Sequence, residues 1–429
     1  MYDGSMNRSR AIRPRSALAK QGWSTGSVLR IAVVVLLVCC VSAPTCVAAA
    51  DQRIPQLLGR RKWAQARKVA KKMDIKDRSA FEPFFSAVAA ADWPEVSNQY
   101  EGLRVRVRHL GSKDPDAMID NAIWPAVEET YRGYRYFEDW SEEVLAIFRE
   151  IVLDPLPARS ILLAGSDAVR FVSTAFRDAT GQPKIFIVCP GRLPDNSYVD
   201  YLRVSHGRRI DLPSELDISL TFEAYFDAVR RGRITAGSDI RLIDGKLRIT
   251  GTRGIRDASR VLTKLFFDLN NKDHRFFVEE GYVIPWMYPY LAPKGPLMEL
   301  HPIKVRTLPL PLVKEDRDFW STLVARLMSD ATFRDNVSAR RAFAGMRAAI
   351  AGLYAHRKLY MEAGHAFREA LHIDPTHHGV AYRYAEMMKR RGHRAAAAEV
   401  IETQIKRDPD NERLKAYFES LAPPAVTDP

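Results

Sequence analysis

Apolar positions along the chain change their spacing twice. From residue 52 to residue 152 they recur at helical intervals, as Trp63, Ala66, Ala70 and Met73 do, which is typical of amphipathic helices. From residue 155 short apolar runs alternate with helical spacing, and from Glu315 onward the spacing is helical to the end. The pattern therefore predicts a helical region, an α/β region and a second helical region.

The first helical region predicts two pairs of helices. One pair covers Phe81–Ala91 and Pro94–Val107, and the other covers Asp116–Tyr136 and Ser141–Val152. Apolar and basic residues alternate from Leu103 to Arg108, which also suits a strand, although the preceding pattern favours a continuing helix. We expect the many aromatic side chains of this region to pack between its helices.

The middle region predicts strands connected by helices. Ile161–Ala164 and Lys184–Val188 are apolar runs on either side of a helical stretch, the order found in three-layer α/β domains. The other expected elements are helices at Asp195–Val204, Thr221–Arg231 and Ile255–Asn270, a hairpin of Ile240–Ile243 and Lys246–Thr250 across Asp244-Gly245, and strands at Arg275–Glu279 and Leu297–His301. We predict a helical region over residues 51–154 and a Rossmann-like α/β domain over residues 155–312.

The C-terminal region contains a repeat. Pro375 and Pro409 are 34 residues apart, the period of tetratricopeptide repeats. The consensus positions of that repeat are matched by Tyr354, Ala363, Phe367, Ala370 and Pro375 in one copy and by Gly392, Ala397 and Pro409 in the next. Two copies are too few to be stable alone, so we expect them to pack on neighbouring helices. The repeat domain is assigned to residues 313–422, with a tail at 423–429.

The net charge is concentrated partly at the N-terminus. The chain has 65 Lys and Arg against 52 Asp and Glu, a formal charge of +13. Six basic residues and one acidic residue lie before residue 51, so +5 belongs to this segment and +8 remains. The basic stretch, the apolar run Ile31–Ala43 and Ala48-Ala49-Ala50 indicate a secretory signal cleaved after about Ala50. Alternatively, Val28–Ala50 is long enough for an uncleaved membrane anchor, and both alternatives predict an exported, periplasmic or cell-envelope protein.

The remaining basic residues occur in small clusters spread over all three regions. These are Arg60-Arg61-Lys62, Lys71-Lys72, Arg208-Arg209, Arg230-Arg231 and Lys389-Arg390-Arg391. We expect each on a solvated helix face or helix terminus. No aromatic and basic module of a nucleic-acid-binding fold accompanies them, so no nucleic-acid partner is predicted.

Neither a metal nor a cofactor is predicted. Cys189 is the one cysteine after the targeting segment, and a lone cysteine at the end of an apolar strand is expected to be a small core residue. Six of the ten histidines fall between His356 and His393, without a cysteine or an H-E-x-x-H pattern. The chain also lacks the G-x-G-x-x-G and P-loop patterns of nucleotide sites and the G-x-S-x-G pattern of serine hydrolases.

The loop Gly165-Ser166-Asp167 is the first candidate binding site. It joins a predicted strand to a predicted helix, where open α/β sheets bind their ligands, and Arg170 lies one turn into that helix. Backbone amides at a helix N-terminus attract anions. The alternative is that Ser166 or Asp167 caps the helix and Gly165 relieves the turn.

A second candidate site lies at the end of a later strand. Glu279 and Glu280 precede an aromatic stretch that includes Trp286, a combination that could bind a sugar and support acid/base chemistry. Adjacent residues on a strand point to opposite faces, so the two carboxylates do not form a pair by themselves. A helix cap with a packed aromatic lid is the favoured interpretation.

Several motifs resemble the soluble C-terminal portion of bacterial O-mannosyltransferase-like membrane proteins. They are Ser160–Phe171, Leu193–Tyr198, Asp200–Leu202, Phe277–Glu280 and Trp286–Tyr290. Gly165, Asp167, Arg170 and Phe171 match that family's first motif, whereas Ala164 and Ser166 depart from it. The resemblance covers residues 117–421.

The resemblance implies an exported module without the family's catalytic part. Glycosyl transfer in that family is expected within a bundle of membrane-spanning helices, and this chain has at most one such segment, so no catalytic residue carries over. An accessory role in binding a protein or a glycan is implied instead. Asp167, Arg170, Asn196, Tyr198, Glu279 and Glu280 would then line the loops of the α/β domain.

Two functions remain open from the sequence. The favoured hypothesis is a non-enzymatic exported protein whose repeats bind a protein partner, with an accessory role in envelope glycosylation and a membrane glycosyltransferase as a candidate partner. The alternative is a glycosyltransferase-related enzyme or a glycan-binding subunit that uses the loops of the α/β domain.

Overall fold

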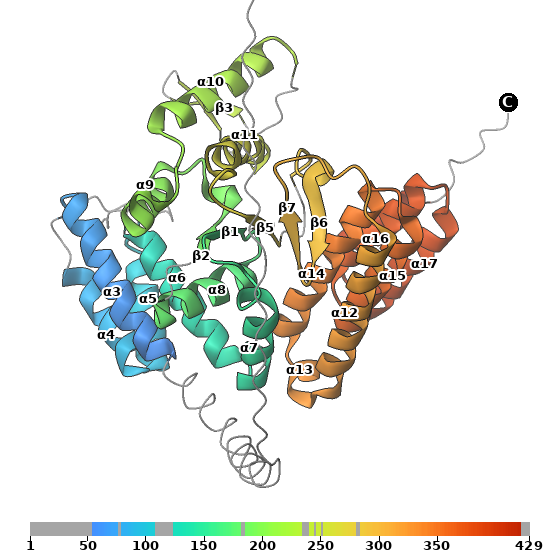
Figure 1. The fold of residues 1–429 in the computed structure, drawn as a ribbon, viewed down its shortest axis with the longest axis horizontal. Coiled ribbons are helices and arrows are strands. Elements are labelled where there is room, and N and C mark those ends of the chain that lie inside the picture. The colour runs from blue at the N-terminus through green and yellow to red at the C-terminus, as the bar shows by residue number, and fades with distance from the viewer. Residues whose placement is uncertain are drawn as a thin grey trace, which may run out of the picture. The chain divides into compact units, whose positions relative to one another are not determined.

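The computed structural model describes residues 54–75, 79–107, 123–181, 185–233, 240–243, 246–249, 252–279 and 284–421. Contacts between residues divide the chain into Met1–Ala50 and Asp51–Pro429. The first unit, with the expected targeting segment, lies outside the described residues. Figure 1 shows the second unit, in which helices predominate around a small sheet.

The N-terminal helices follow the predicted hairpin pattern. They are α3 (Ile54–Lys72), α4 (Glu82–Ala90, after the turn Ser79–Phe81), α5 (Trp93–Arg104), α6 (Trp124–Asp139) and α7 (Glu142–Phe148), which continues into a π-helical turn at Arg149–Leu153. Ala91 adopts a left-handed φ of 59° and Asp92 caps α5, so α4 and α5 form the expected hairpin. The helix ends at Arg104, earlier than predicted, and residues 108–122 lie outside the described part of the chain.

The main sheet has five strands in the order β2-β1-β5-β7-β6. They are β1 (Ser160–Leu163), β2 (Ile185–Val188), β5 (Phe276–Val278), β6 (Leu291–Lys294) and β7 (Leu297–Leu300). Strand β1 pairs in parallel with β2 and β5, whereas β7 pairs antiparallel with β5 and β6. The sheet is therefore mixed, and the predicted strand, helix, parallel strand order is confirmed in its first half.

Helices cover both faces of this sheet (Figure 1). Phe186 of β2 and Phe276 of β5 share one face because both pair with Ile161. Their rings contact His206 of α9 (Asn196–His206) and Phe267 of α11 (Thr252–Asn270). Helix α8 (Asp167–Thr180) joins β1 to β2 and lies on the other face. An α/β fold with flanking helices is thus confirmed.

Two elements of the α/β region differ from expectation. Helix α10 (Glu215–Arg230) begins six residues before the predicted Thr221, because Ser214 and Asp217 form a capping box. Strand β6 was not predicted, since Pro293 interrupts its short apolar run and proline is depleted from strands.

The hairpin of β3 (Ile240–Ile243) and β4 (Lys246–Ile249) forms a separate sheet, and its turn lies outside the described residues. Short 3-10 turns lie at Pro190–Arg192, Gly207–Arg209 and Tyr288–Tyr290.

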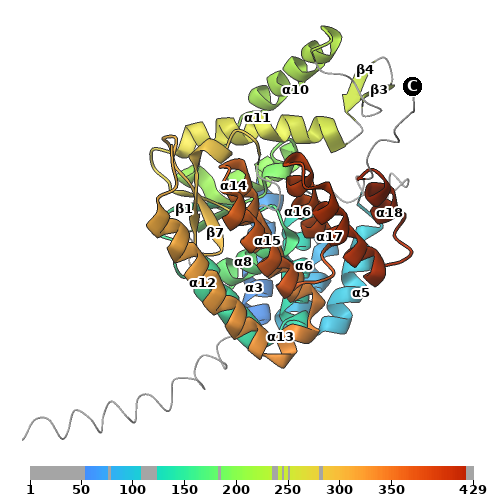
Figure 2. The same ribbon diagram turned by 90° about the vertical axis from the view of Figure 1, so that its right-hand side faces the viewer.

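The last four of the C-terminal helices repeat at an interval of 34 residues. They are α12 (Leu310–Ser329), α13 (Ala331–Asp335), α14 (Val337–His356), α15 (Tyr360–Ile373), α16 (His378–Arg390), α17 (Arg394–Arg407) and α18 (Glu412–Glu419). Helices α15 and α17 start 34 residues apart, at 360 and 394, and so do α16 and α18, at 378 and 412. Figure 2 shows α14 to α17 side by side.

Helix α14 connects these helices to the rest of the unit. The indole Nε1 of Trp140 donates to Ser338 Oγ at 2.7 Å, and its ring lies 6.3 Å from that of Phe343. Trp140 is 3% exposed, so this contact is part of one continuous core. Among the described residues, no helix combines the length and the apolar character needed to cross a membrane.

We expect Trp140→Ala to lower the free energy of unfolding by about 3–5 kcal/mol, the usual loss for a buried tryptophan. Urea unfolding followed by circular dichroism measures this change. Val337→Ala is the control, because Val337 begins the same helix but is 47% exposed, and its effect should stay within about 0.5 kcal/mol. A loss below about 1 kcal/mol for Trp140→Ala would contradict the role of this contact.

Candidate functional site

The first candidate site is a cleft of about 710 Å³ at the carboxyl ends of β1 and β5, which we call the strand-end cleft. Its lining comes from the loop after β1, from Glu279 after β5, from α6, and from α13 and α14. Ligands of open α/β sheets bind at this edge. The polar side chains that line it are Arg135, Tyr136, Asp139, Ser166, Asp167, Glu279, Asp335, Asn336, Ser338, Arg341 and His377.

The inner wall of the cleft is built by the predicted loop. Ser166 caps α8, because its Oγ accepts from the Val169 amide at 3.3 Å. The Ser166 amide in turn donates to Glu279 Oε2 at 3.1 Å. Glu279 is 2% exposed, and burial raises its pKa despite the hydrogen bonds from Ser166 and Gly165. Gly165, Ser166 and Glu279 are therefore brought together, as capping groups that hold the loop against the strand end.

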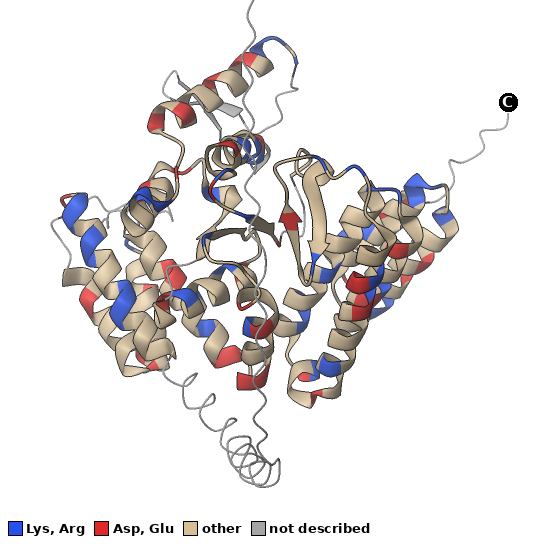
Figure 3. Cartoon of the chain, viewed as in Figure 1, with Lys and Arg blue, Asp and Glu red and all other residues tan. Residues whose placement is uncertain are grey.

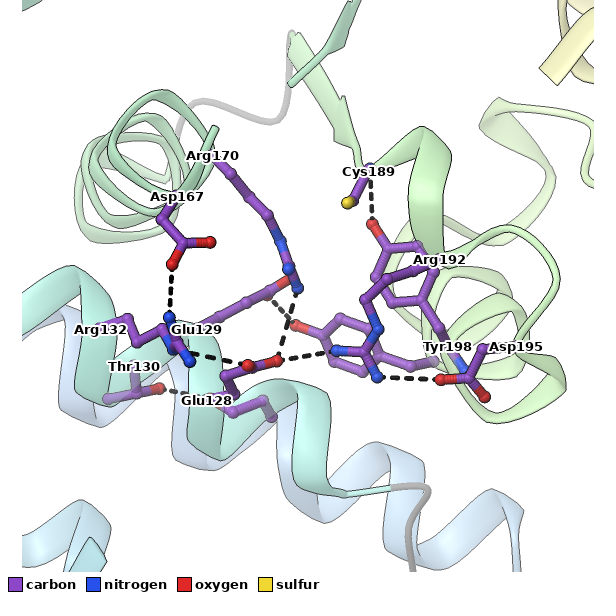
Figure 4. Close-up of polar contacts among 12 residues, drawn as sticks. Glu128, Glu129, Thr130, Arg132, Asp167, Arg170, Cys189, Arg192, Asp195 and Tyr198 are labelled. Carbon is purple, nitrogen blue, oxygen red and sulfur yellow. Dashed lines mark hydrogen bonds and ion pairs between the residues drawn. The ribbon is translucent and has the colours of Figure 1, made fainter. Parts of the chain in front are cut away.

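Asp167 and α6 form the side of the cleft. The Asp167 carboxylate forms an ion pair with Arg132 of α6 (Figure 4). Burial, followed by the negative charge of Asp167, raises the pKa of Tyr136 to about 12. Arg135 is exposed and makes no ion pair within the described part of the chain.

The outer wall comes from the start of α14. Asn336 caps this helix through a 2.8 Å hydrogen bond from the Ala339 amide, and Ser338 Oγ donates to Asp139. Arg341 is exposed, and among the described residues the carboxylate it approaches is that of Asp374, at 3.7 Å. Carboxylates, guanidinium groups and hydroxyl groups thus line the cleft together, a combination suited to a neutral ligand with many hydrogen-bonding groups.

Arg170 and Tyr198 do not line this cleft. Arg170 is 6% exposed and lies beneath the loop, with its guanidinium 4.5 Å from the ring of Phe171. It points to Glu128 and Glu129 of α6, at 3.7 and 3.8 Å. The hydroxyl of Tyr198 accepts a hydrogen bond from the Cys189 amide at 2.9 Å (Figure 4). Both residues belong to a buried network that packs α6, α8 and α9 together.

Three further candidates are also placed away from the cleft lining or left undescribed. Asn196 is exposed at the first turn of α9, which Asp195 caps. Trp286 is half-buried and packs against α11, where its Nε1 donates to the Arg260 carbonyl at 3.2 Å. This position is consistent with a packed lid. Glu280 lies outside the described residues.

The buried network centres on Lys62. This residue is fully buried, and its Nζ lies 2.6 Å from Glu129 Oε2 and 2.7 Å from Asp178 Oδ2. Tyr201 also donates to Glu129, at 2.6 Å. Burial lowers the pKa of Lys62, but the charges of Asp178 and Glu129 raise it overall. The prediction that Arg60-Arg61-Lys62 forms a solvated cluster was therefore wrong for Lys62, because its partners come from helices distant in the sequence.

A second candidate site is a groove of about 650 Å³ on the C-terminal helices, which we call the C-terminal groove. Its lining includes Gly352 and His356 of α14, five residues of α16, Arg391 directly after α16, and Tyr417 of α18. The five from α16 are Tyr382, Arg383, Glu386, Met387 and Arg390, and the remaining lining residues are Tyr288, Ala355 of α14, and Tyr360 and Phe367 of α15. Helices α14, α15, α16 and α18 therefore all contribute to the groove.

The predicted repeat positions shape these helices. Ala363, Phe367, Ala370 and Ala397 are buried, and Tyr354 donates to the buried Asp316 of α12 at 2.7 Å. Gly392 has a φ of +83° between α16 and α17, a conformation that favours glycine. Pro375 and Pro409 follow α15 and α17, and the Pro375 carbonyl accepts from Gln404 and Arg407.

The sequence pointed to the inner wall of the cleft and to Asp167 beside it, and to Phe367 in the groove, but it did not identify the other lining residues of the two sites. Arg135 and Arg341 lie far apart in the sequence, and no motif connects them. Arg390 and Arg391 were predicted only as part of a solvated cluster. Figure 3 shows that Lys and Arg are spread over the helices and interspersed with Asp and Glu, so charge alone does not mark the groove.

No group of three or more potential metal ligands occurs among the described residues. Comparison of the chain with protein-family models, with curated proteins and with solved structures finds no match.

His206 should make stability depend on pH. Burial and then the charge of Arg177 lower its pKa to about 3, with Arg209 acting in the same direction and Asp178 and Glu129 opposing. Because the folded pKa lies below the unfolded value of 6.5, the unfolded state binds the proton first as the pH falls. His206 should thus contribute stability above pH 6.5 that is lost toward pH 3, by at most about 1.4 kcal/mol per pH unit.

Urea unfolding of the protein and of His206→Phe and His206→Asn between pH 7.5 and about 4.5 measures this contribution. The variants should lose stability less steeply below pH 6.5, because the carboxylates are common to all three proteins. Parallel pH profiles for the protein and both variants would contradict the assignment.

Proposed function

We propose that this chain is an exported, non-enzymatic binding protein that holds a segment of a protein partner in the C-terminal groove. The observation that carries the proposal is the groove itself, a hollow of about 650 Å³ lined by aromatic and arginine side chains. Aromatic residues and arginine are enriched in protein-binding interfaces. The groove's volume suits a short segment.

The helix arrangement supports a tetratricopeptide assignment for this region. The 34-residue offset between equivalent helices matches the period of that repeat. Stacked helix pairs of this kind form concave binding surfaces. The first helices of the pairs, α14, α16 and α18, contribute to the groove, as expected for such a surface.

The polar loops of the α/β region favour a structural role for the predicted site residues. Ser166 caps a helix, Glu279 binds the capping loop, and Asp167 is paired with Arg132. The parallel strand, helix, strand unit of β1, α8 and β2 supports a Rossmann-like origin for this region. With the motif resemblance, we propose an accessory role in envelope glycosylation, with a membrane glycosyltransferase as the partner.

The strand-end cleft favours a second candidate function, the binding of a glycan by a glycosyltransferase-related enzyme or subunit. Its mixture of hydrogen-bonding groups and the half-buried Tyr136 suit a polyhydroxylated ring. Glu279 is too strongly tied to the Ser166 amide to be assigned an acid/base role.

Two glycines of α14 allow each site to be blocked separately. Gly352 lines the groove and Gly345 lines the cleft. A Cβ at Gly345 would meet no atom within 4 Å, whereas one at Gly352 would lie 2.4 Å from the end of the flexible Arg383 side chain. Glycine is about 0.8–1 kcal/mol less favourable than alanine inside a helix, and leucine is among the strong helix formers, so both variants should fold.

We expect Gly352→Leu to reduce capture of the protein partner from a membrane and envelope extract by about ten-fold or more, since the leucine fills the groove. Quantitative mass spectrometry of proteins retained by the immobilised chain measures this loss. Gly345→Leu is the matched control and should retain the same proteins as the unmodified chain. Equal retention by all three proteins would contradict partner binding in the groove.

The second candidate function predicts the opposite dependence. Neutral oligosaccharides should raise the melting temperature of the unmodified chain and of Gly352→Leu, but not that of Gly345→Leu, because only the last fills the cleft. Differential scanning fluorimetry with an oligosaccharide panel measures the shifts. The absence of a shift for the unmodified chain, or an equal shift for Gly345→Leu, would exclude glycan binding in the cleft.

A further inference from the structure

The C-terminal groove carries more positive than negative charge. Arg383, Arg390 and Arg391 line it, with Glu386 as the one carboxylate among its lining residues. Glu386 is already engaged, because Arg390 Nε donates to it at 2.9 Å and the Tyr417 hydroxyl donates at 3.0 Å. Burial acts to raise the pKa of Glu386, but its hydrogen bonds lower it overall. The described lining residues therefore include three arginines against one carboxylate, a formal excess of cationic charge.

Aromatic rings position the guanidinium groups. Arg391 lies 4.4 Å from the ring centroid of Tyr360, and Arg383 lies 5.8 Å from that of Phe367. Arg391 has no ion-pair partner within the described chain and is exposed. Because Arg391 is stacked on the ring, its N–H edge remains available for a carboxylate, which a guanidinium binds in a bidentate manner.

Gly352 gives Arg383 its room in the groove. Its missing side chain leaves space for the Arg383 guanidinium, which lies 2.4 Å from the position a Cβ would take. Glycine inside a helix is unfavourable, so the space is obtained at a cost in helix stability. The close approach keeps the cation at the groove wall formed by α14.

Aromatic rings that line the groove offer apolar contacts. Tyr382 and Tyr417 meet edge to face at 5.1 Å, and Tyr288 stacks on His356 at 4.4 Å. The Tyr382 hydroxyl is buried and has no hydrogen-bond partner among the described residues. Buried polar groups normally have a hydrogen-bond partner, so a ligand that reaches the Tyr382 hydroxyl would supply the partner it lacks.

We propose that the partner segment held in the groove is an acidic, extended peptide whose carboxylate side chains bind Arg383 and Arg391 and whose aromatic side chains pack on the groove's tyrosines. This inference rests on the proposed function and names the chemistry of the partner. Charge complementarity selects acidic side chains, and the ring-lined walls select aromatic neighbours.

The probe is a fluorescein-labelled peptide of alternating Glu, Asp and Tyr residues with an amidated C-terminus. A second peptide carries Gln and Asn in place of Glu and Asp. Fluorescence anisotropy should show binding of the acidic peptide at least about ten-fold tighter than that of the neutral one. The affinity should fall as salt rises, because screening weakens exposed ion pairs.

Arg383→Gln and Arg391→Gln should each weaken the binding of the acidic peptide by about five-fold or more. Arg394→Gln is the matched control, because Arg394 is exposed at the start of α17, does not line the groove, and carries the same charge. Unchanged circular dichroism and urea midpoints establish that the variants are folded. Equal binding of the acidic and neutral peptides, or no effect of either groove arginine, would overturn the proposal.

Two further outcomes separate this inference from the function on which it rests. Loss of partner capture by Gly352→Leu together with no preference for the acidic peptide would leave protein binding intact and reject the acidic segment. If the acidic peptide binds only with a free C-terminus, the terminal carboxylate is the ligand and acidic side chains are rejected. Unchanged capture by Gly352→Leu would reject the proposed function itself.

Discussion

The buried ammonium group of Lys62 is the constraint on which the N-terminal half depends. It joins α3 to Glu129 of α6, to Asp178 of α8 and to Tyr201 of α9. An unpaired charge at this depth would cost several kcal/mol, so the four helices must meet at this point. Arg177 further holds the Asp178 carboxylate, and the pKa of Asp178 lies well below its usual range although burial alone would raise it.

The same network sets the position of the strand-end cleft. Glu128 lies between Arg132, Arg170 and Arg192, and Arg132 extends to Asp167 at the cleft (Figure 4). Helices α6 and α8 are thereby fixed relative to each other, and with them two walls of the cleft. The third wall, at α14, is added by the contact of Trp140 with Ser338.

Helix α14 relates the two candidate sites. Gly345 opens one of its faces to the cleft, and Gly352 opens another to the groove. Buried Arg347 lies between these positions and binds Asp316 of α12 at 2.8 Å. Because α12 and α14 also pack on the strands β6 and β7, removing the C-terminal helices would expose the sheet. Blocking each site through its own glycine therefore tests function more cleanly than truncation.

The sequence by itself determined the local elements and their order. Apolar runs such as Ile161–Ala164 predicted the buried strands, and the 34-residue interval predicted equivalent helices, because both signals depend on residues close along the chain. Only the tertiary structure decided that Lys62 is buried rather than solvated. It also decided that Arg170 lies beneath the loop after β1, whereas Asp167 lines the strand-end cleft. It also decided that the walls of both sites come from distant helices. Ion pairing and burial depend on partners far apart in the sequence, such as Lys62 and Glu129, 67 residues apart. Patterns among neighbouring residues do not predict such partners.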